Sequence, residues 1–393
     1  MGLNNTPSSE RTHIGIFGRT NSGKSSLLNA ITGQNLAIVS EVSGTTTDPI
    51  YKAMEILPLG PVMFIDTAGL DDDTFLGKMR TEKAYQVLNK TDIAIICVDI
   101  NQGIGSFEKS LIDIIKLKRI PFIVVRNKLD TTSNSANLEY EHDICVSSKT
   151  GKNITYLKEL IGSLINPDDS KRLIKDLLKP QDIVVLVVPI DSSAPKGRLI
   201  LPQQQTIRDI LEAGALALVT KETELSSALE GLSKKPRMVI TDSQAFKKVS
   251  EIVPSDIPLT SFSILFSRYK GNLKVMAEGA KSISNLKDED TILISEGCTH
   301  HRQCEDIGTV KLPKWITSYT HKKLNFEFSS GGDFPLDLSK YSLIVHCGAC
   351  MLNEKEVSFR LKTAIEKNIP ITNYGTLIAY IHGILERTLE PFN

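Results

Sequence analysis

Short apolar runs alternate with stretches of helical periodicity from residue 11 onward. In the first part of the chain, four runs rich in Ile, Val and Phe predict buried strands at residues 13–18, 62–69, 92–99 and 121–128. Mixed apolar and polar stretches between them, such as residues 24–33 and 81–89, predict helices. Since parallel strands need crossover connections, this alternation predicts a doubly wound parallel sheet over residues 11–167.

Two further α/β units follow. A charged segment with proline near both ends predicts a linker at residues 168–181. The next unit, residues 182–261, is a small alternation of three predicted strands with helices, and small sheets often complete themselves by pairing with a copy. The last unit, residues 262–393, has predicted strands at 291–297, 341–347 and 369–373. We therefore predict three α/β domains, with a disordered leader at residues 1–10 and a homodimer formed through the middle domain.

Composition and charge narrow the class of protein. The 393 residues include 46 Lys and Arg against 46 Asp and Glu, so the balance gives no support for binding nucleic acid or an anionic membrane. No apolar run is long enough to span a bilayer, and the first residues lack the apolar core of a secretion signal. We expect a cytoplasmic protein that binds neither nucleic acid nor membrane.

A phosphate-binding motif follows the first predicted strand. The stretch from Gly18 to Ser25 matches the pattern G-x-x-x-x-G-K-[ST], in which backbone N–H groups surround phosphate oxygens at a helix N-terminus. Lys24 would reach the β- and γ-phosphates, and the hydroxyl of Ser25 would hold Mg²⁺. The predicted nucleotide-binding residues of this loop are Gly18, Asn21, Ser22, Gly23, Lys24, Ser25 and Ser26.

Four further segments in the same order complete a nucleotide site. Asp66 ends a strand and would bind Mg²⁺ through water, while Gly69 would offer its N–H to the γ-phosphate. Thr46 lies where a switch loop supplies a second hydroxyl to Mg²⁺. A carboxylate at Asp130 selects guanine, because adenine lacks the N1–H and N2–H₂ donors. Two segments would surround the base. The first contributes Asn127, Lys128 and Asp130, and the second contributes Ser147, Ser148 and Lys149. The sequence therefore predicts a GTPase.

Four of the six cysteines fall in the last hundred residues, whereas Cys97 and Cys145 lie in or beside apolar strand patterns. Cys298 follows one predicted strand, and Cys347 and Cys350 follow another, so three thiolates would meet if those strands are neighbours. Incidental burial, a zinc site, a redox dithiol and a 4Fe–4S cluster are all compatible with these residue types. The spacing does not choose the fourth ligand among Cys304, Glu305, His300, His301 and His346.

The nucleotide motifs resemble those of the translation-factor-related GTPases, closest to the Era and MnmE branch. In that branch the position of Asn21 is associated with K⁺ beside the phosphates, so the resemblance implies K⁺ stimulation. Leu70 follows Gly69 where other GTPases carry a water-orienting Gln, and the assisting Glu of the MnmE branch has no clear counterpart, although Glu82 is near. We expect slow GTP hydrolysis, with Lys24, Thr46, Asp66 and Gly69 at the reacting phosphate.

The whole chain resembles the FeFe-hydrogenase maturation GTPases, the HydF family, because the motifs Cys298-x-His300 and His346-Cys347-x-x-Cys350 follow a GTPase and a small middle domain. The resemblance implies a GTPase domain, a dimerisation domain and a 4Fe–4S domain with Cys298, Cys347 and Cys350 as ligands. It implies a scaffold that receives a transient di-iron precursor from radical-SAM maturases and delivers it to apo FeFe-hydrogenase. A ribosome-associated GTPase with a zinc domain is the alternative, but its usual basic segment is absent.

Overall fold

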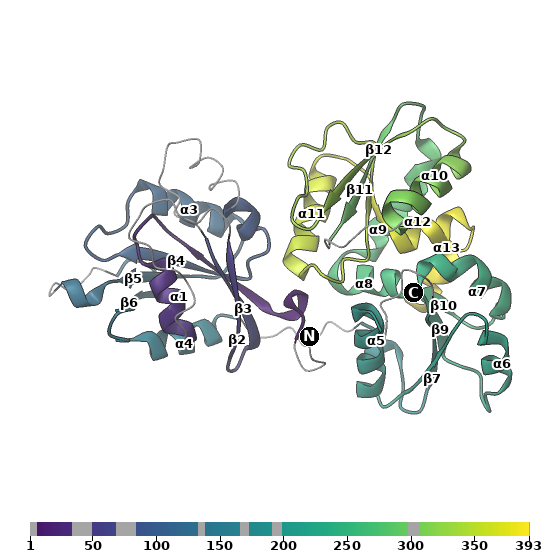
Figure 1. Ribbon diagram of the computed structural model, residues 1–393, viewed down its shortest axis with the longest axis horizontal. Helices are drawn as coiled ribbons and strands as arrows, with labels where there is room; N and C mark the ends of the chain where they lie inside the picture. The colour runs from purple at the N-terminus through teal and green to yellow at the C-terminus, as the bar shows by residue number, and fades with distance from the viewer. Residues whose placement is uncertain are drawn as a thin grey trace. The chain divides into compact units, whose positions relative to one another are not determined.

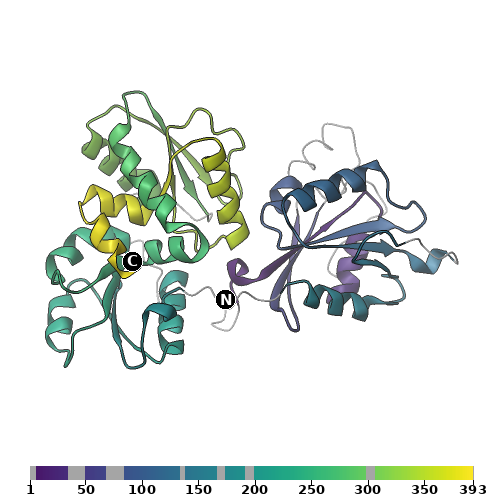
Figure 2. The ribbon, with the colours of Figure 1, turned by 180° about the vertical axis from the view of Figure 1, so that it is seen from behind.

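The computed structural model describes residues 6–33, 49–67, 84–132, 138–165, 173–190, 199–297 and 306–392. The chain divides into two compact units, residues 1–168 and 169–393, each of which is described by itself (Figure 1). Figure 2 shows the same ribbon from behind. None of the helices in these described ranges combines the length and the apolar character needed to cross a membrane.

The first unit is built on a six-stranded sheet in the order β2-β3-β1-β4-β5-β6. The strands are β1 (Thr12–Phe17), β2 (Ile50–Ile56), β3 (Gly60–Asp66), β4 (Ile93–Asp99), β5 (Phe122–Asn127) and β6 (Asp143–Cys145). The predicted doubly wound parallel arrangement is confirmed from β3 to β6. The edge strand β2 runs antiparallel to β3, and its alternation of buried and exposed positions suits an edge.

Helices cover both faces of this sheet. They include α1 (Lys24–Thr32), α3 (Ser106–Leu117) and α4 (Ile154–Ser163). One apolar cluster joins α1 and α4 to the sheet, and a second cluster joins α3 to the opposite face. Successive residues of β1 alternate between the two clusters, with Ile16 in the first and Phe17 in the second. A one-turn 3-10 helix at Ser8–Glu10 lies inside the segment predicted as a leader and buries Ser9.

The second unit contains two four-stranded sheets whose paired strands are all parallel. The first sheet has the order β10-β9-β7-β8 and consists of β7 (Ile183–Val187), β8 (Leu216–Thr220), β9 (Met238–Thr241) and β10 (Leu259–Ser261). The second has the order β12-β11-β13-β14 and consists of β11 (Thr291–Glu296), β12 (Asn325–Ser330), β13 (Leu343–His346) and β14 (Ile371–Asn373). The predicted α/β character of both later parts is confirmed, and β10 and β12 are additions.

The helices of this unit pack between and around the two sheets. They are α5 (Leu201–Glu212), α6 (Leu225–Glu230), α7 (Phe246–Ile252), α8 (Phe262–Lys270), α9 (Leu273–Lys281), α10 (Leu312–Thr320), α11 (Glu354–Glu366), α12 (Tyr374–Ile381) and α13 (Leu385–Leu389), with a π-helix at Ile307–Lys311. The helix predicted over residues 374–389 is divided in two, because Gly383 adopts a positive φ of 70° between α12 and α13.

One apolar cluster contains side chains from both sheets of the second unit. Val185 of β7 and Leu259 of β10 belong to the same cluster as Leu343 of β13. The segment predicted as a linker also takes part, since Leu173 and Ile174 are buried in a second cluster of this unit. The two sheets therefore share a core, although the hydrophobic pattern alone suggested two separate domains.

Candidate functional site

The phosphate-binding loop connects β1 to α1. Gly18 and Gly23 have positive φ values of 152° and 92°, which glycine adopts at little cost. A Cβ on Gly18 would collide with the carbonyl oxygen of Cys97, and one on Gly23 with the side-chain amide of Asn127. Both glycines of the predicted motif are therefore required by the backbone path and by close packing.

Two of the predicted Mg²⁺ residues, Ser25 and Asp66, lie together behind this loop. Ser25 Oγ donates a hydrogen bond of 2.6 Å to Asp66 Oδ2, while the buried Asp66 Oδ1 has no hydrogen-bond partner among the described residues. Burial raises the pKa of Asp66, and the hydrogen bond from Ser25 and the charge of Lys24 partly offset this. A buried carboxylate oxygen without a partner, beside a hydroxyl, is the oxygen-rich environment that Mg²⁺ prefers. These residues fit the ion.

Lys24 is buried at the first turn of α1 and donates hydrogen bonds of 3.0 and 2.8 Å to the carbonyl oxygens of Gly18 and Arg19. These bonds hold its ammonium group across the loop in which phosphate would sit. Arg19 in turn forms an ion pair of 3.0 Å with the buried Glu108 of α3, which ties the loop to the neighbouring helix. Asn21 is exposed and has a positive φ of 61°.

The base-recognition segments are joined to the phosphate loop by Asn127. Its Nδ2 donates to the carbonyl oxygens of Ser22 and Gly23, and its Oδ1 accepts from the backbone N–H and the hydroxyl of Ser148. Ser147 Oγ donates to Asp130 Oδ1 over 2.6 Å. The Asp130 carboxylate is exposed and held in place, as a guanine acceptor must be. Three of the predicted segments therefore meet in one site.

Two ion pairs at this site were not predicted from the sequence. Lys128 pairs with Asp99 at the end of β4 over 2.7 Å. Arg126 of β5 makes two hydrogen bonds of 2.9 Å to Asp143 of β6, which fixes the two strands that carry the base-recognition segments. Asp99 ends an apolar strand as Asp66 does, so its position was a usable signal.

Several predicted site residues lie outside the described residues. They are Thr46, Gly69, Leu70 and Glu82 of the nucleotide site, and Cys298, His300, His301, Cys304 and Glu305 of the cysteine site. Their roles stay predictions.

The remaining cysteines lie at the carboxyl edge of the second sheet of unit 2. β13 pairs directly with β11, and Ser295 lies opposite His346 in the register. Cys347 leaves β13 next to Gly297, which leaves β11 just before Cys298. Gly297 N–H donates to Cys347 Sγ over 3.1 Å, and Ala349 N–H donates to the same sulfur over 3.4 Å. The strand adjacency that the cysteine prediction required is confirmed.

Backbone donors aimed at a sulfur favour its anionic form, which is the form that binds metal. Burial raises the pKa of Cys347, and the N–H groups of Gly297 and Ala349 and the charge of Arg360 counteract it. Burial also raises the pKa of Cys350 to about 11. Within the described residues no group of three potential ligands gathers, and Cys298 lies outside them. The two N–H donors around the sulfur of Cys347 suit a metal-bound thiolate. The residues described here therefore fit the predicted 4Fe–4S cluster.

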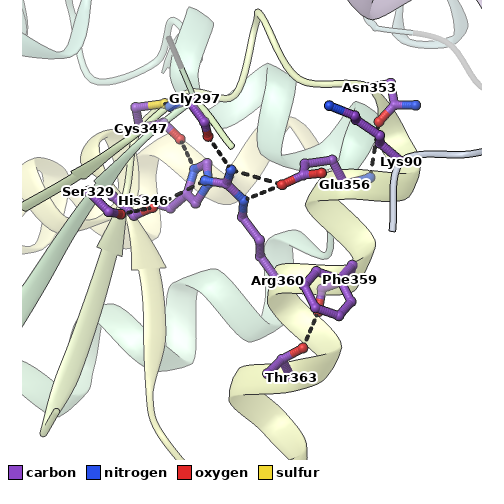
Figure 3. A network of polar contacts seen from close by, with 12 residues as sticks. Lys90, Gly297, Ser329, His346, Cys347, Asn353, Glu356, Phe359, Arg360 and Thr363 are labelled. Atoms are coloured by element: carbon purple, nitrogen blue, oxygen red, sulfur yellow. Dashed lines mark hydrogen bonds and ion pairs between the residues drawn. The ribbon is translucent and has the colours of Figure 1, made fainter. Parts of the chain in front are cut away.

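His346 precedes Cys347 and is buried below the cysteine loop. Its Nδ1 lies 2.9 Å from the carbonyl oxygen of Cys347, and its Nε2 lies 3.1 Å from Arg360 Nη1 (Figure 3). Burial lowers the pKa of His346 to about 3, and the positive charge of Arg360 adds to this effect. Both ring nitrogens of this predicted ligand candidate are thus engaged within the protein.

Arg360 of α11 was not predicted as a site residue. Its side chain is 1% exposed and contacts Glu356, Ser295, the carbonyl oxygen of Gly331 and His346. A signal existed in the sequence, because Arg360 falls on the same helical face as Val357, Leu361 and Ala364. A charged residue among apolar positions marks a buried ion pair or a functional group.

Three family models match consecutive parts of the chain. The model described as a 50S ribosome-binding GTPase matches residues 13–128. The hydrogen maturase F dimerization domain matches residues 173–271, and the hydrogen maturase F tetramerization domain matches residues 274–391. The chain belongs to the hydrogen maturase F family. The predicted resemblance to HydF is thereby confirmed, and the chain combines a GTPase domain with the two oligomerization domains that the family models describe.

Relatives outside the family match the GTPase part. The chain is 39% identical over 154 residues to the tRNA modification GTPase MnmE of Legionella pneumophila strain Corby, covering 38% of this chain and 34% of MnmE. It is 37% identical over 167 residues to the GTPase Der of Nautilia profundicola, covering 38% of this chain and 35% of Der. The chain thus spans about a third of the length of the curated relatives it matches.

A solved structure of an Aquifex aeolicus Era variant bound to GDP and aluminium fluoride superposes with a TM-score of 0.37 and 20% identity. It covers 53% of this chain and 93% of that chain. The family membership and the motif geometry together assign GTP and Mg²⁺ binding, and GTP hydrolysis, to the first unit. The family describes residues 274–391 by tetramerization, so the 4Fe–4S cluster predicted there stays a prediction.

Proposed function

We propose that this hydrogen maturase F protein is a GTP-regulated scaffold that binds a 4Fe–4S cluster through Cys298, Cys347 and Cys350. It would receive a transient di-iron precursor from radical-SAM maturases and deliver it to apo FeFe-hydrogenase. The observation that supports this proposal is the sulfur of Cys347, which accepts two backbone N–H bonds at the edge where β11 and β13 end side by side.

The cluster would be a resident attachment point and not a catalyst of GTP hydrolysis. A 4Fe–4S cluster held by three thiolates leaves one iron with a ligand that another unit can replace. The residues that would hold it come from two parallel strands of one sheet, whose carboxyl edge is the usual ligand side of α/β folds. This arrangement offers an incoming di-iron unit a place to bind without unfolding the domain.

The GTPase part would act as a switch with slow turnover. Lys24 would neutralise charge on the phosphates, Ser25 would bind Mg²⁺, and Asp66 would orient the water shell of the ion. Asn21 would hold K⁺ beside the phosphates, where a cation stabilises developing charge as an arginine finger does. Leu70 has no polar group to align water, so low intrinsic turnover is expected. The GTP state would then adjust the affinity for partners.

The homodimer proposed for the middle domain would use the edge strand β8. Among the strands that the structure describes, β8 pairs with β7 alone, and its side chains Leu216 and Val219 are 55% and 44% exposed. Apolar residues on an uncovered sheet edge favour pairing with another strand. The family model over residues 173–271 carries the description of a dimerization domain, which agrees with this assignment.

Anaerobic purification followed by iron, sulfide and zinc analysis tests the cluster. The wild type is expected to carry iron and sulfide, and Cys298→Ala is expected to lose both. Cys145→Ala is the matched control, since Cys145 lies on β6 of the GTPase unit and should leave the iron content unchanged. A colourless wild type with one zinc per chain would exclude the cluster and favour a zinc domain.

The proposed coupling between GTP and delivery has a separate test. The affinity for apo-hydrogenase and the rate of cofactor transfer are measured with GDP and with a non-hydrolysable GTP analogue. A difference between the two nucleotides supports a switch. Equal affinities and equal rates would contradict it, and GTP hydrolysis would then serve another step.

A further inference from the structure

The group below the cysteine loop has a definite direction of hydrogen bonding. A guanidinium carries only donors, so the contact between Arg360 Nη1 and His346 Nε2 requires Nε2 to be the acceptor. The proton of the neutral ring then lies on Nδ1, which donates to the carbonyl oxygen of Cys347 over 2.9 Å. The contact with Arg360 therefore favours the tautomer of His346 that carries its proton on Nδ1.

Arg360 itself is fixed from every side. Nε and Nη2 donate to Glu356 Oε1 over 3.1 and 2.9 Å, and Nη2 also donates to the carbonyl oxygen of Gly331 over 2.6 Å. Nη1 donates to Ser295 Oγ of β11 as well as to His346 of β13. One guanidinium thus holds α11 against both strands from whose ends the cysteine residues follow (Figure 3).

The contacts that begin at Arg360 continue into the cysteine loop. The carbonyl oxygen of Cys347 accepts a hydrogen bond from His346 Nδ1. The backbone N–H of Cys347 donates to the carbonyl oxygen of Ser295 over 3.0 Å. Both backbone groups of Cys347 are therefore fixed, so its Sγ faces the N–H groups of Gly297 and Ala349. The order of contacts runs from Arg360 through His346 to the backbone of Cys347.

We propose that Arg360 is a positioning residue of the cluster site, which acts through His346 to set the Cys347 loop and keeps His346 Nε2 from binding iron. This inference rests on the proposed cluster function. It makes His346 a support of the loop, although the sequence allowed it as a fourth ligand. Residues that orient metal ligands typically affect metal affinity by about 10- to 100-fold.

The first experiment needs no metal. In the full metal-free chain labelled with ¹⁵N-histidine, the His346 signal, assigned by its loss in His346→Asn, should show a protonated Nδ1 and an unprotonated Nε2. A protonated Nε2 would overturn the inference. This result is independent of iron, so it tests the contact between Arg360 and His346 even if the wild type binds no cluster and the proposed function fails.

The second experiment measures iron loss to a chelator after anaerobic reconstitution with iron and sulfide. His346→Asn keeps a side-chain N–H for the Cys347 carbonyl and should lose iron at the wild-type rate, whereas His346→Leu should lose it about 10-fold faster. If both variants lose iron equally fast, and a histidine nitrogen coupling disappears from the electron paramagnetic resonance of the reduced cluster, His346 is a ligand and the inference is wrong.

The third experiment replaces the buried pair as a whole. Arg360→Met with Glu356→Met leaves no buried charge unpaired and should also speed iron loss about 10-fold. Lys362→Met with Glu366→Met is the matched control, because this pair has the same spacing on α11 but is exposed. Equal rates of iron loss in the two double variants would overturn the inference. If the first double variant does not fold, the two His346 variants and the tautomer measurement still test the inference.

Discussion

The nucleotide site and the cysteine site are built in different ways. The phosphate loop is one contiguous segment in which glycines allow the backbone to make the binding surface, and side chains from β3 and β5 are added at its margin. The cysteine loop is positioned instead by a buried side-chain group from β11, β13 and α11. A site made of backbone is encoded locally, whereas a site made of buried polar side chains depends on the whole fold around it.

The largest expected effect concerns base recognition. Asp130→Asn replaces one carboxylate acceptor by an amide donor, which opposes the N2–H₂ donor of guanine, whereas xanthine carries a carbonyl oxygen acceptor at that position. The preference for GTP over xanthosine triphosphate should fall by about 10⁴-fold. Competition binding measures it, with Asp113→Asn on the exposed face of α3 as the control. An unchanged preference would remove Asp130 from the site.

The next effect concerns hydrolysis. Lys24→Ala removes the buried ammonium from the phosphate loop and should lower the rate of GTP hydrolysis by about 10²–10³-fold. Phosphate release under saturating GTP is the measurement. The exposed Lys152→Ala should hydrolyse GTP at the wild-type rate. Iron content should be the same in both variants, and a loss of iron in Lys24→Ala would show that the two sites are not built independently.

The reciprocal change lies in the cysteine loop. Cys347→Ser removes the sulfur that accepts the N–H bonds of Gly297 and Ala349. Iron binding should weaken by more than about 10-fold, which is the loss already typical of supporting residues. Iron analysis after anaerobic reconstitution tests this, with Cys145→Ser as the control. GTP hydrolysis should stay at the wild-type rate, because no residue of the phosphate loop changes.

The smallest effect tests the backbone of the two loops. Ala349 has a positive φ of 57° without being glycine, unlike Gly18 and Gly23 in the phosphate loop. Ala349→Gly should relieve this strain and raise the free energy of unfolding by about 0.5 kcal/mol. Chemical denaturation of the metal-free chain measures it. Destabilisation would mean that the methyl group of Ala349, which is buried, contributes more by packing than its conformation costs.

The same contrast explains what could be predicted from the sequence. The strands that carry Asp66, Asn127 and Cys347 were recognised as apolar runs, and their adjacent loops followed from parallel pairing. Arg360 was not recognised, because its partners Ser295 and His346 lie 65 and 14 residues away and are unremarkable in sequence. Hydrophobic periodicity reports burial of apolar side chains, but it does not tell which buried polar side chains satisfy one another.

The edge strands also escaped prediction for a physical reason. β2 and β12 are half-exposed, and their sequences IYKAMEI and NFEFSS lack the continuous apolar character of the central strands.

The shared core of the second unit was not predicted from the sequence either. Alternating strands and helices restart after residue 182 and again after residue 262, and nothing in the local pattern shows that the two sheets bury their faces against common helices.

That shared core has a consequence for how often the cysteine loop opens. The boundary between the two maturase family models, between residues 271 and 274, lies inside the part of the chain whose side chains share this core. The strands and helices whose side chains form this core should therefore show a common slow class of amide hydrogen exchange. Any molecule that pairs with β8 of the folded unit lowers the population of its open states by mass action. The assembly state would then set how long Cys347 stays protected from solvent.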